Sequence, residues 1–343
     1  MASNIKVLVV DDSVVYRELL REGLNKKFGI EVVATAVDPF DAKNKILQYR
    51  PNVMVCDIEM PKMNGLTFIK KLLPQYPIPT IMTSSSGNEA FDSIDAGAVD
   101  FVAKCVTGTG VGRQEFVDEV AEKIRIAKDS KVVLRKTPSK QPIIDNTSRI
   151  RPVSKHVTDL IAIGASTGGT EAIANVLTRL PGELPGIVVV QHIPPMFSNM
   201  FAQRINKCTQ FTAKEACTGD EIKPGTVLIA PGDKQMKVTK KGGKLIVEVE
   251  HGPKVSGHCP SVDVLFHSVA EAVGKNAIGV IMTGMGADGA KGMLEMHEKG
   301  ARTIGQDQES CVVYGMPKEA YVLGGVSKQA SLQNIPKAIL EFL

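Results

Sequence analysis

Short apolar runs alternate with longer amphipathic segments about five times between residues 5 and 128. We expect strands at residues 5–10, 31–36, 53–57, 79–84 and 100–104. Strands that alternate with helices in this way form a mostly parallel sheet with helices on both faces. The first part of the chain is therefore predicted to be a doubly wound α/β domain.

The same alternation returns after residue 157. Apolar segments at 159–166, 186–192, 225–232 and 277–289 indicate strands, and helical spacing at 262–273 and 290–300 indicates helices between or after them. The segment 244–252 alternates apolar and acidic residues, which is typical of an antiparallel or edge strand. We expect a second doubly wound α/β domain with a mostly parallel sheet, three-layered and Rossmann-like.

Length and charge divide the chain further. The 343 residues suit two domains, and 43% hydrophobic with 23% charged residues is the balance of a folded protein. Residues 129–156 hold seven Lys or Arg and two Asp or Glu, and the resulting net charge of +5 exceeds the +4 of the whole chain. This segment also contains three prolines and little apolar periodicity. We interpret 129–156 as a linker between domains at 1–128 and 157–343. Because no basic stripe lies on a predicted folded face, we do not expect nucleic-acid binding.

The first residues lack a basic segment followed by a long apolar run, and no later stretch reaches membrane-spanning length. We therefore expect a cytoplasmic protein without membrane insertion. The six cysteines lie far apart and form no CxxC pair. We expect most of them to be buried thiols.

Polar side chains gather where the predicted strands of the first domain end. Asp11 and Asp12 close the first strand, Asp57 the third, Ser84 the fourth and Lys104 the fifth. Each alone could be a polar residue at the solvent boundary, but chemistry in parallel sheets gathers at these carboxyl ends. Converging carboxylates are tolerated when a divalent cation joins them, and Mg²⁺ suits one or two carboxylates plus a phosphate. The pattern predicts a metal-dependent phosphoryl site in which Lys104 neutralises phosphoryl oxygens.

With "DIEMPKMNG" after Asp57, this pattern resembles the receiver domain of two-component response regulators over about 120 residues, which implies a flavodoxin-like fold. The resemblance implies that Asp57 accepts a phosphoryl group. Cys105 stands where that family usually has proline, which puts the geometry of that loop in question. The implied Mg²⁺ ligands are Asp11, Asp12, Asp57 and the Glu59 backbone carbonyl, and the implied switch residues are Ser84, Phe101 and Lys104.

One serine stands out in the second domain. Gly164-Ala-Ser-Thr-Gly168 fits G-x-S-x-G, a tight turn that exposes Ser166. A serine near a helix start is more often an N-cap, and it needs a base before it can attack anything. His192 directly follows the apolar strand "GIVVVQ", where a parallel sheet would bring it near Ser166. The remaining histidines are expected in structural or solvated positions: His156, His251, His258, His267 and His297.

The carboxylate that orients such a base is harder to assign. Asp288 follows "VIMTGMGA" at another strand end, although it could instead cap the next helix, and Asp263 at a helix start competes with it. Ser166, His192 and Asp288 would form a triad, with oxyanion donors from the Ser166 turn or the "TGMGADG" loop. The order Ser, His, Asp differs from that of ordinary α/β-hydrolases. "GASTGG" also lacks the second glycine of a dinucleotide site.

Together "IGASTGGTEAI", "QHIPP", "IAPGDKQM", "PSVDVLFHSVA" and "TGMGADGAKGM" resemble the protein-glutamate methylesterases among chemotaxis response regulators, over the whole chain. The resemblance implies a triad of Ser166, His192 and Asp288, with the Met285 backbone N–H holding the oxyanion. It implies glutamate γ-methyl esters of chemoreceptors as substrate, with deamidation of receptor glutamines in some members. It further implies a chemotaxis histidine kinase as phosphodonor and no cofactor in the catalytic domain. We expect a monomer.

Two other functions are compatible with parts of the pattern. A phospho-switched module could bind a partner without catalysis, and it would release no methanol. A DNA-binding regulator would need a helix-turn-helix or winged helix after the linker, whereas roughly 190 residues of α/β pattern follow it. The sequence favours a phosphorylation-activated serine hydrolase.

Overall fold

The computed structural model describes residues 4–85, 89–104, 110–128, 130 and 158–343. The chain divides into two compact units, Met1–Ser139 and Lys140–Leu343. The division falls inside the predicted linker, and that linker, Cys105 and His156 lie almost wholly outside the described residues, so the predicted domain limits remain predictions. No helix among the described residues has both the length and the apolar character needed to cross a membrane.

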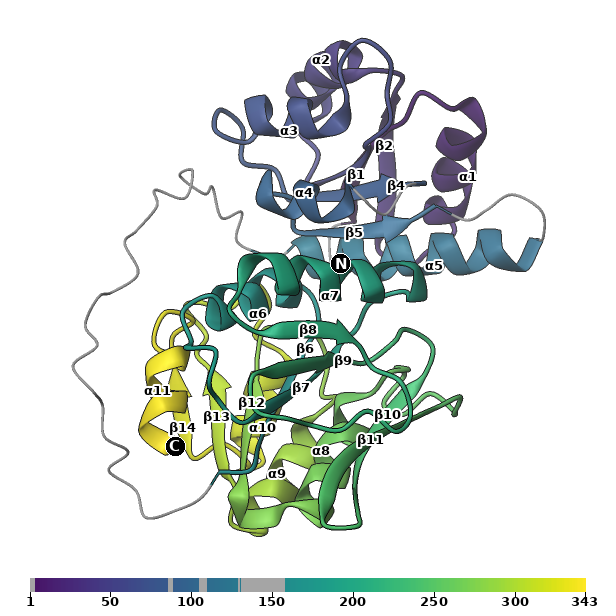
Figure 1. Ribbon diagram of the computed structural model, residues 1–343. Coiled ribbons are helices and arrows are strands. Elements are labelled where there is room, and N and C mark those ends of the chain that lie inside the picture. Colours follow the sequence, from purple (N-terminus) through teal and green to yellow (C-terminus); the bar gives the residue numbers. More distant parts are fainter. Residues whose placement is uncertain (1–3, 86–88, 105–109, 129, 131–157) are drawn as a thin grey trace. The chain divides into compact units, whose positions relative to one another are not determined.

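The first unit is a five-stranded parallel sheet in the order β2-β1-β3-β4-β5, which is the flavodoxin-like order (Figure 1). Helix α1 packs against α5, with Tyr16 and Phe116 in edge-to-face contact at 6.0 Å between ring centroids. The strands are β1 (Ile5–Val10), β2 (Ile30–Ala36), β3 (Val53–Asp57), β4 (Thr80–Ser84) and β5 (Asp100–Ala103). The helices are α1 (Val14–Asn25), α2 (Pro39–Tyr49), α3 (Gly65–Leu72), α4 (Ala90–Asp95) and α5 (Gly110–Lys128).

Local sequence explains where these elements begin and end. All five residues of β3 are buried, as expected for a central strand covered on both faces. Asp38 caps α2 by accepting hydrogen bonds from two backbone N–H groups, and Asn64 caps α3 by accepting one from the Thr67 N–H. Strands β1 and β3 pair in parallel, so their carboxyl ends lie side by side, with Asp57 at the end of β3 and Asp11 directly after β1.

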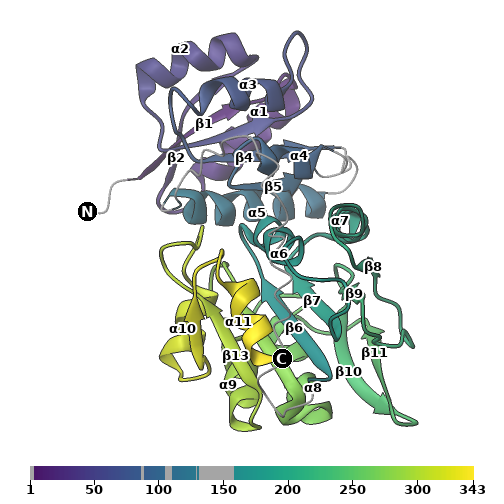
Figure 2. The same cartoon turned by 60° about the vertical axis from the view of Figure 1, so that its left-hand side comes forward.

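The second unit is a seven-stranded parallel sheet in the order β14-β13-β12-β6-β7-β9-β8, with a separate antiparallel hairpin of β10 and β11 (Figure 2). Its sheet strands are β6 (Leu160–Ala165), β7 (Gly186–Gln191), β8 (Thr212–Glu215), β9 (Thr226–Ile229), β12 (Ala277–Ile281), β13 (Arg302–Gln306) and β14 (Lys328–Ala330). The hairpin strands are β10 (Gln235–Lys241) and β11 (Lys244–Glu250). The helices are α6 (Gly169–Leu177), α7 (Pro195–Cys208), α8 (Val262–Ala272), the short 3-10 helix η1 (Gly274–Asn276), α9 (Ala290–Glu298), α10 (Met316–Val322) and α11 (Ile335–Phe342).

Strand β6 marks the switch point of this sheet. From β6 the chain adds β7, β9 and β8 on one side, and later β12, β13 and β14 on the other. In open parallel sheets, ligands bind in the crevice beyond the carboxyl ends of the strands at such a point. The ends of β6, β7 and β12 are therefore the expected location of a site.

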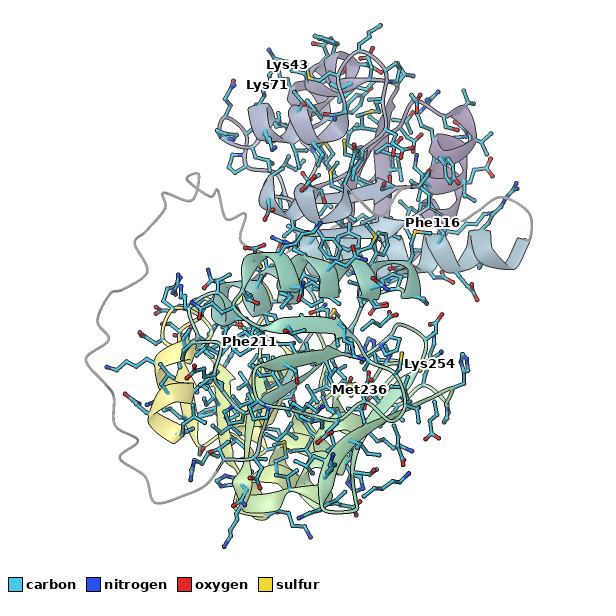
Figure 3. The ribbon with its side chains drawn as sticks, in the orientation of Figure 1. Lys43, Lys71, Phe116, Phe211, Met236 and Lys254 are labelled. Atoms are coloured by element: carbon cyan, nitrogen blue, oxygen red, sulfur yellow. The ribbon has the colours of Figure 1, made fainter. Side chains whose placement is uncertain are left out.

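A continuous apolar core supports this sheet. Phe197, Phe201 and Phe266 are fully buried, and Met236 and Phe211, labelled in Figure 3, are buried in the same unit. Helix α8 packs against α9 and against the hairpin strand β10. This packing fixes the start of α8 beside the carboxyl end of β12.

The architecture confirms the predicted fold class, and the hairpin confirms that 244–252 is antiparallel. The predicted strand at 277–289 was too long, because β12 ends at Ile281. The sequence did not predict β8, β10, β13 and β14. Strands β8, β13 and β14 are short and rich in polar residues or glycine, and β10 holds three lysines. The expectation of mostly buried thiols was wrong for the described cysteines. Cys56 and Cys311 are buried, whereas Cys208 and Cys217 are exposed and Cys259 is intermediate.

Candidate functional site

Ser166 lies in the turn between β6 and α6. It directly follows Ala165, the last residue of β6, and α6 is capped by Gly168, which has a left-handed φ of 75° and makes no side-chain cap hydrogen bond. Ser166 is therefore not the N-cap of α6, which removes the commonest structural explanation for a serine at a helix start.

Glycines let the backbone close around this serine. A Cβ on Gly284 would lie 2.7 Å from Ser166 Cβ, and a Cβ on Gly169 would lie 2.1 Å from Gln191 Oε1. Both distances are shorter than van der Waals contact allows, so a side chain at either position would displace the neighbouring atoms. The strand that contains Gln191 and the loop after β12 are consequently held directly against the Ser166 turn.

His192 is brought to the same place by the register of the sheet. Strands β6 and β7 are parallel neighbours, and Ala165 pairs with Gln191, so Ser166 and His192 each follow a paired residue. The His192 N–H donates to the Ala165 carbonyl at 3.2 Å, and Gln191 Nε2 donates to the Ser166 carbonyl at 2.8 Å. The two candidate residues therefore leave adjacent strand ends together.

The His192 ring contacts Asp288 through one nitrogen. Nε2 lies 2.7 Å from Asp288 Oδ2, and the two side chains are only 9% and 1% exposed. The other nitrogen, Nδ1, is buried and has no hydrogen-bond partner among the described residues. A carboxylate on Nε2 favours the tautomer that carries its proton there, which leaves Nδ1 as an acceptor.

The environment of Asp288 keeps it ionised. Its carboxylate also accepts hydrogen bonds from Ser261 Oγ at 2.7 Å, the Val262 N–H at 2.8 Å and the Asp263 N–H at 3.1 Å. These donors form the start of α8, where the helix dipole favours negative charge. Burial acts to raise the pKa of Asp288, but the bonds from His192, Ser261 and Val262 outweigh it, and the pKa is lowered from its ordinary value.

The two alternatives for the carboxylate are not supported by the geometry. Helix α9 is capped by Gly289 without a side-chain cap hydrogen bond, so Asp288 does not cap the helix that follows it. The Asp263 carboxylate accepts hydrogen bonds from the Gly292 N–H and from Ser256 Oγ. Burial raises the pKa of Asp263, whereas the pKa of Asp288 is lowered.

Met285 lies in the loop after β12, directly after Gly284, whose backbone approaches Ser166 closely. The Ser166 N–H donates to the Thr283 carbonyl at 3.0 Å, and the Gly284 carbonyl accepts from the N–H groups of Gly315 and Met316. Among the described residues, the Met285 N–H donates no backbone–backbone hydrogen bond. An amide in this loop without a backbone partner is a candidate donor to an oxyanion.

One residue at this site was not assigned a role from the sequence. The ring of His258 stacks on the ring of His192, with centroids 3.7 Å apart and an angle of 13° between the planes. The sequence prediction placed His258 among the structural histidines, because it follows a glycine-rich turn without an apolar strand before it. The sequence signal for a role at the site is its position three residues before Ser261, which caps the helix that binds Asp288.

The strand ends of the first unit form a second cluster. The oxygens of Asp11, Asp12 and Asp57 lie within 4.8 Å of one another, and Lys104 Nζ lies 2.8 Å from both Asp11 Oδ2 and Asp57 Oδ2. Lys104 also lies over the Tyr16 ring, 4.6 Å from its centroid. Burial raises the pKa of Asp57 to about 6 although Lys104 opposes the shift.

The other switch candidates lie on the neighbouring strands. Ser84 ends β4 and Phe101 lies in β5, and both side chains are buried. The Phe101 ring packs edge-to-face against Phe91, with centroids 5.5 Å apart. Glu59 is exposed two residues after Asp57.

The cluster fits a divalent cation by its chemistry. Asp57 Oδ1 is buried and has no hydrogen-bond partner among the described residues, although a carboxylate oxygen is a strong acceptor. Three carboxylates with such an unsatisfied oxygen are a donor set that Mg²⁺ prefers. The residues present therefore fit a Mg²⁺ ion.

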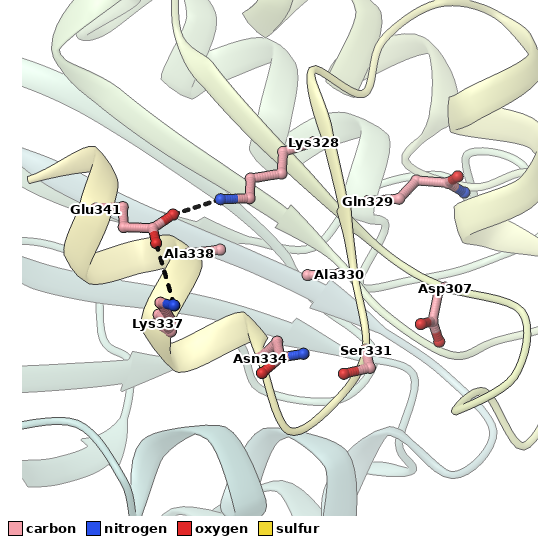
Figure 4. Close-up of a pocket in the computed structure, with 9 residues that line it drawn as sticks. All are labelled: Asp307, Lys328, Gln329, Ala330, Ser331, Asn334, Lys337, Ala338 and Glu341. Carbon is pink, nitrogen blue, oxygen red and sulfur yellow. Dashed lines mark hydrogen bonds and ion pairs between the residues drawn. The ribbon is translucent and has the colours of Figure 1, made fainter.

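A hollow at the edge of the second sheet lies apart from these residues. This cavity of about 410 Å³ is lined by residues after β13 and on β14 and α11 (Figure 4). Lys328 pairs with Glu341 there, and Lys337 Nζ lies 3.9 Å from the same carboxylate. None of Ser166, His192 and Asp288 lines it, so its charged groups do not contribute to the candidate site.

Comparisons with known proteins agree on both units. Residues 7–110 match the response regulator receiver domain model, and residues 161–339 match the CheB methylesterase model. A protein-glutamate methylesterase/protein-glutamine glutaminase of Syntrophomonas wolfei is 47% identical over 99% of this chain and 98% of its own. One of Salmonella typhimurium is 44% identical over 98% and 97%.

Among solved structures, the CheB methylesterase catalytic domain of Thermotoga maritima is similar with a TM-score of 0.53 and 36% identity, covering 54% of this chain and 99% of that one. The relatives match from end to end, and the catalytic-domain model alone spans more than half of the chain. The chain therefore belongs to the CheB methylesterase family, with a response regulator receiver domain ahead of the catalytic domain.

Proposed function

We propose that this chain hydrolyses glutamate γ-methyl esters on chemoreceptors, releasing methanol, and that it also deamidates receptor glutamines. The reaction serves adaptation in chemotaxis and takes place in the cytoplasm, where the modified receptor helices lie. The hydrogen bond between His192 and Asp288, beside the turn that holds Ser166, is the observation that carries the proposal. A charged carboxylate on one imidazole nitrogen and an unpartnered second nitrogen are the requirements of a general base.

Catalysis begins when Ser166 Oγ attacks the ester carbonyl and its proton passes to Nδ1 of His192. Nδ1 is the nitrogen available for this, because Nε2 is bound to Asp288. Asp288 holds the ring in the required tautomer and stabilises the imidazolium as it forms. The Met285 N–H donates to the oxyanion of the tetrahedral intermediate.

The intermediate collapses when methanol leaves with the proton from His192, which forms an acyl-enzyme on Ser166. Water then gives a proton to His192 and attacks the acyl carbon, which restores Ser166 and the receptor glutamate. The same attack on a primary amide releases ammonia instead of methanol. Each turnover converts a neutral receptor side chain into an anion and so changes the charge repulsion in the receptor.

Control by the first unit follows from its acidic cluster. Asp57 accepts the phosphoryl group from a histidine kinase, and Asp11, Asp12, Asp57 and the Glu59 carbonyl would hold the Mg²⁺ that this transfer uses. The ion would neutralise the crowded carboxylates and the phosphoryl oxygens. Lys104, which is paired with Asp57 in the resting state, would pair with a phosphoryl oxygen after transfer. Ser84 and Phe101, buried on the adjacent strands, are the switch residues.

The alternative, a partner-binding module without catalysis, has no use for these features. A binding surface does not require a buried His–Asp pair with an unpartnered ring nitrogen. It also does not require a serine turn that excludes any Cβ at Gly284. The catalytic proposal therefore explains more of the described residues.

The test is release of labelled methanol from methyl-labelled receptor membranes. Ser166→Ala should abolish release, and His192→Gln should lower turnover by about a thousandfold or more. Ser166→Ala should keep the unfolding midpoint of the parent chain. For His192→Gln the midpoint is measured beside turnover, because this change removes a hydrogen bond to the buried Asp288. Methanol release by Ser166→Ala at a rate near that of the parent would contradict the proposal.

A further inference from the structure

The strongest unassigned contact in the second unit is the stacking of two histidine rings. His258 covers one face of the His192 ring at 3.7 Å, with the planes only 13° apart. The two residues are far apart in sequence, and His258 comes from the loop that joins β11 to α8. Two nearly parallel imidazoles at this distance are in face contact, so each ring limits how far the other can tilt.

The loop that carries His258 is tightly held. The Val255 N–H donates to the His258 carbonyl at 3.0 Å and the His258 N–H donates to the Val255 carbonyl at 2.9 Å. The turn between them uses left-handed φ angles at Ser256 and Gly257. Gln235, which is 3% exposed, donates from Nε2 to the His258 carbonyl at 3.3 Å and accepts from the Ser261 N–H through Oε1 at 2.8 Å. The backbone of His258 is thus fixed before any substrate binds.

The same segment also holds Asp288, which contacts the edge of the His192 ring. Ser261 and Val262, three and four residues after His258, bind the Asp288 carboxylate. Asp288 holds the edge of the His192 ring through Nε2, and His258 holds its face. The hydrogen bond restrains the edge of the ring, and the stacked ring restrains its tilt. Together they define where Nδ1 points.

We propose that His258 is a positioning residue for the general base: it holds the plane of the His192 ring, and with it the direction of the unpartnered Nδ1. This inference rests on the proposed function, since it takes His192 as the base. His258 acts through the plane of its ring and takes no proton from substrate. Misplacement of a catalytic group by about 1 Å can cost a hundredfold in rate, so loss of the clamp lowers kcat.

The experiment compares ring replacement with ring removal in the full chain, using methyl-labelled receptor membranes at several receptor concentrations. His258→Ala should lower kcat about 10- to 100-fold with KM changed less than about twofold. His258→Phe, which keeps a flat ring, should recover kcat to within about threefold of the parent, and His258→Leu should not. His251→Ala, an exposed histidine of the same loop, is the matched control and should behave as the parent.

The pH profile separates positioning from proton transfer. If His258 acts by its plane alone, His258→Phe keeps the acid limb of kcat where the parent has it. Loss of that limb in His258→Phe, or full activity in His258→Ala, would overturn the proposal. Unfolding midpoints of all variants check that the loop still folds, and equal losses of kcat in Ala, Leu and Phe variants would also overturn it.

The variant His192→Gln separates a failure of the His258 proposal from a failure of the proposed function. If His192→Gln is inactive while His258→Ala is fully active, the clamp is refuted and the proposed function stands. If His192→Gln retains parental activity, the proposed function itself fails, whatever the His258 variants do.

Discussion

At the scale of single residues, Asp288 has two tasks that are usually separate. Its Oδ2 atom contacts the base His192. The carboxylate also accepts hydrogen bonds from Ser261 Oγ and the Val262 N–H at the start of α8. Its lowered pKa is the result, because four donors stabilise the charged form against burial. Asp288 therefore stays ionised at lower pH than an ordinary aspartate.

Ser261→Ala tests how far the donors of Asp288 matter. The change removes the hydroxyl that donates to Asp288 Oδ1 and that caps α8. We expect a loss of about 1–2 kcal/mol in the free energy of unfolding, measured by urea denaturation. We also expect turnover to fall several-fold, because His192 and Val262 still hold the carboxylate.

Ser268→Ala is the matched control for that prediction. Ser268 lies on the same helix, and its hydroxyl accepts from the Val238 N–H at 2.9 Å without contacting Asp288. It should lose stability by a similar amount and keep its turnover. Equal turnover in both variants would show that the Ser261 hydroxyl has no influence on the site.

Gly284→Ala tests the close approach of the β12 loop to the serine. The new methyl group would lie 2.7 Å from Ser166 Cβ and 2.3 Å from Met316 Sδ. We expect kcat for methanol release to fall at least about tenfold, because the serine or the Met285 amide must shift. Gly252→Ala, where the nearest atom would be a side-chain carbon of Gln235 at 3.2 Å, should remain active. A fully active Gly284→Ala would contradict the described packing.

Much of the residue pattern could be predicted from the sequence, because strand ends are visible as polar residues after apolar runs. Ser166 and His192 were placed beside each other on that basis, and the register of β6 and β7 places them so. The contacts of Asp288 with α8 and the stacking of His258 could not be predicted. Both depend on how α8 packs against the sheet, and no local pattern in residues 251–263 reports that packing.

At the scale of elements, α8 is the piece that connects the catalytic groups to the core. Its first turn binds Asp288, and its later turns pack against α9 and β10. Between α8 and α9, His267 lies 2.5 Å from Glu295, an ion pair when His267 is protonated. The hydrogen bond to Glu295 raises the pKa of His267 above its ordinary value of 6.5.

His267→Gln should lose stability only at low pH. A histidine whose pKa is raised in the folded state stabilises it fully below the unfolded value of 6.5, and this contribution is lost as pH rises through the folded pKa. We expect a loss below about 1 kcal/mol at pH 5.5, since the His267 side chain is 56% exposed. At pH 9 the loss should vanish. Urea unfolding at both pH values measures it, and equal losses at the two would contradict the ion pair.

The elements themselves were largely predictable where apolar runs are long. The strands of the first unit and β6, β7 and β9 were predicted close to their observed bounds. Strands β8, β13 and β14 were missed because they hold three to five residues with few apolar side chains. Such strands are held by their neighbours in the sheet and not by their own sequence.

At the scale of the whole molecule, two units of different chemistry share one chain. The first has a buried carboxylate cluster with a lysine, and the second has a serine, an imidazole and a carboxylate. Asp57→Asn should abolish stimulation of methanol release by a small phosphodonor in the presence of Mg²⁺. The amide that replaces the carboxylate cannot accept the phosphoryl group.

Asp118→Asn provides the comparison, because Asp118 is a surface residue of the same unit paired with Lys27. It should retain full stimulation by the phosphodonor. Stimulation of Asp57→Asn to the level of the parent chain would place the phosphorylated residue elsewhere.

The start of α8 offers a way to observe the site without altering it. The amide protons of Val262 and Asp263 point at the same carboxylate that binds the imidazole. Any event that changes the charge on that imidazole will therefore shift their resonances in an NMR spectrum. Acylation, inhibitor binding and changes of charge at the site can therefore be followed from the backbone amide signals of Val262 and Asp263.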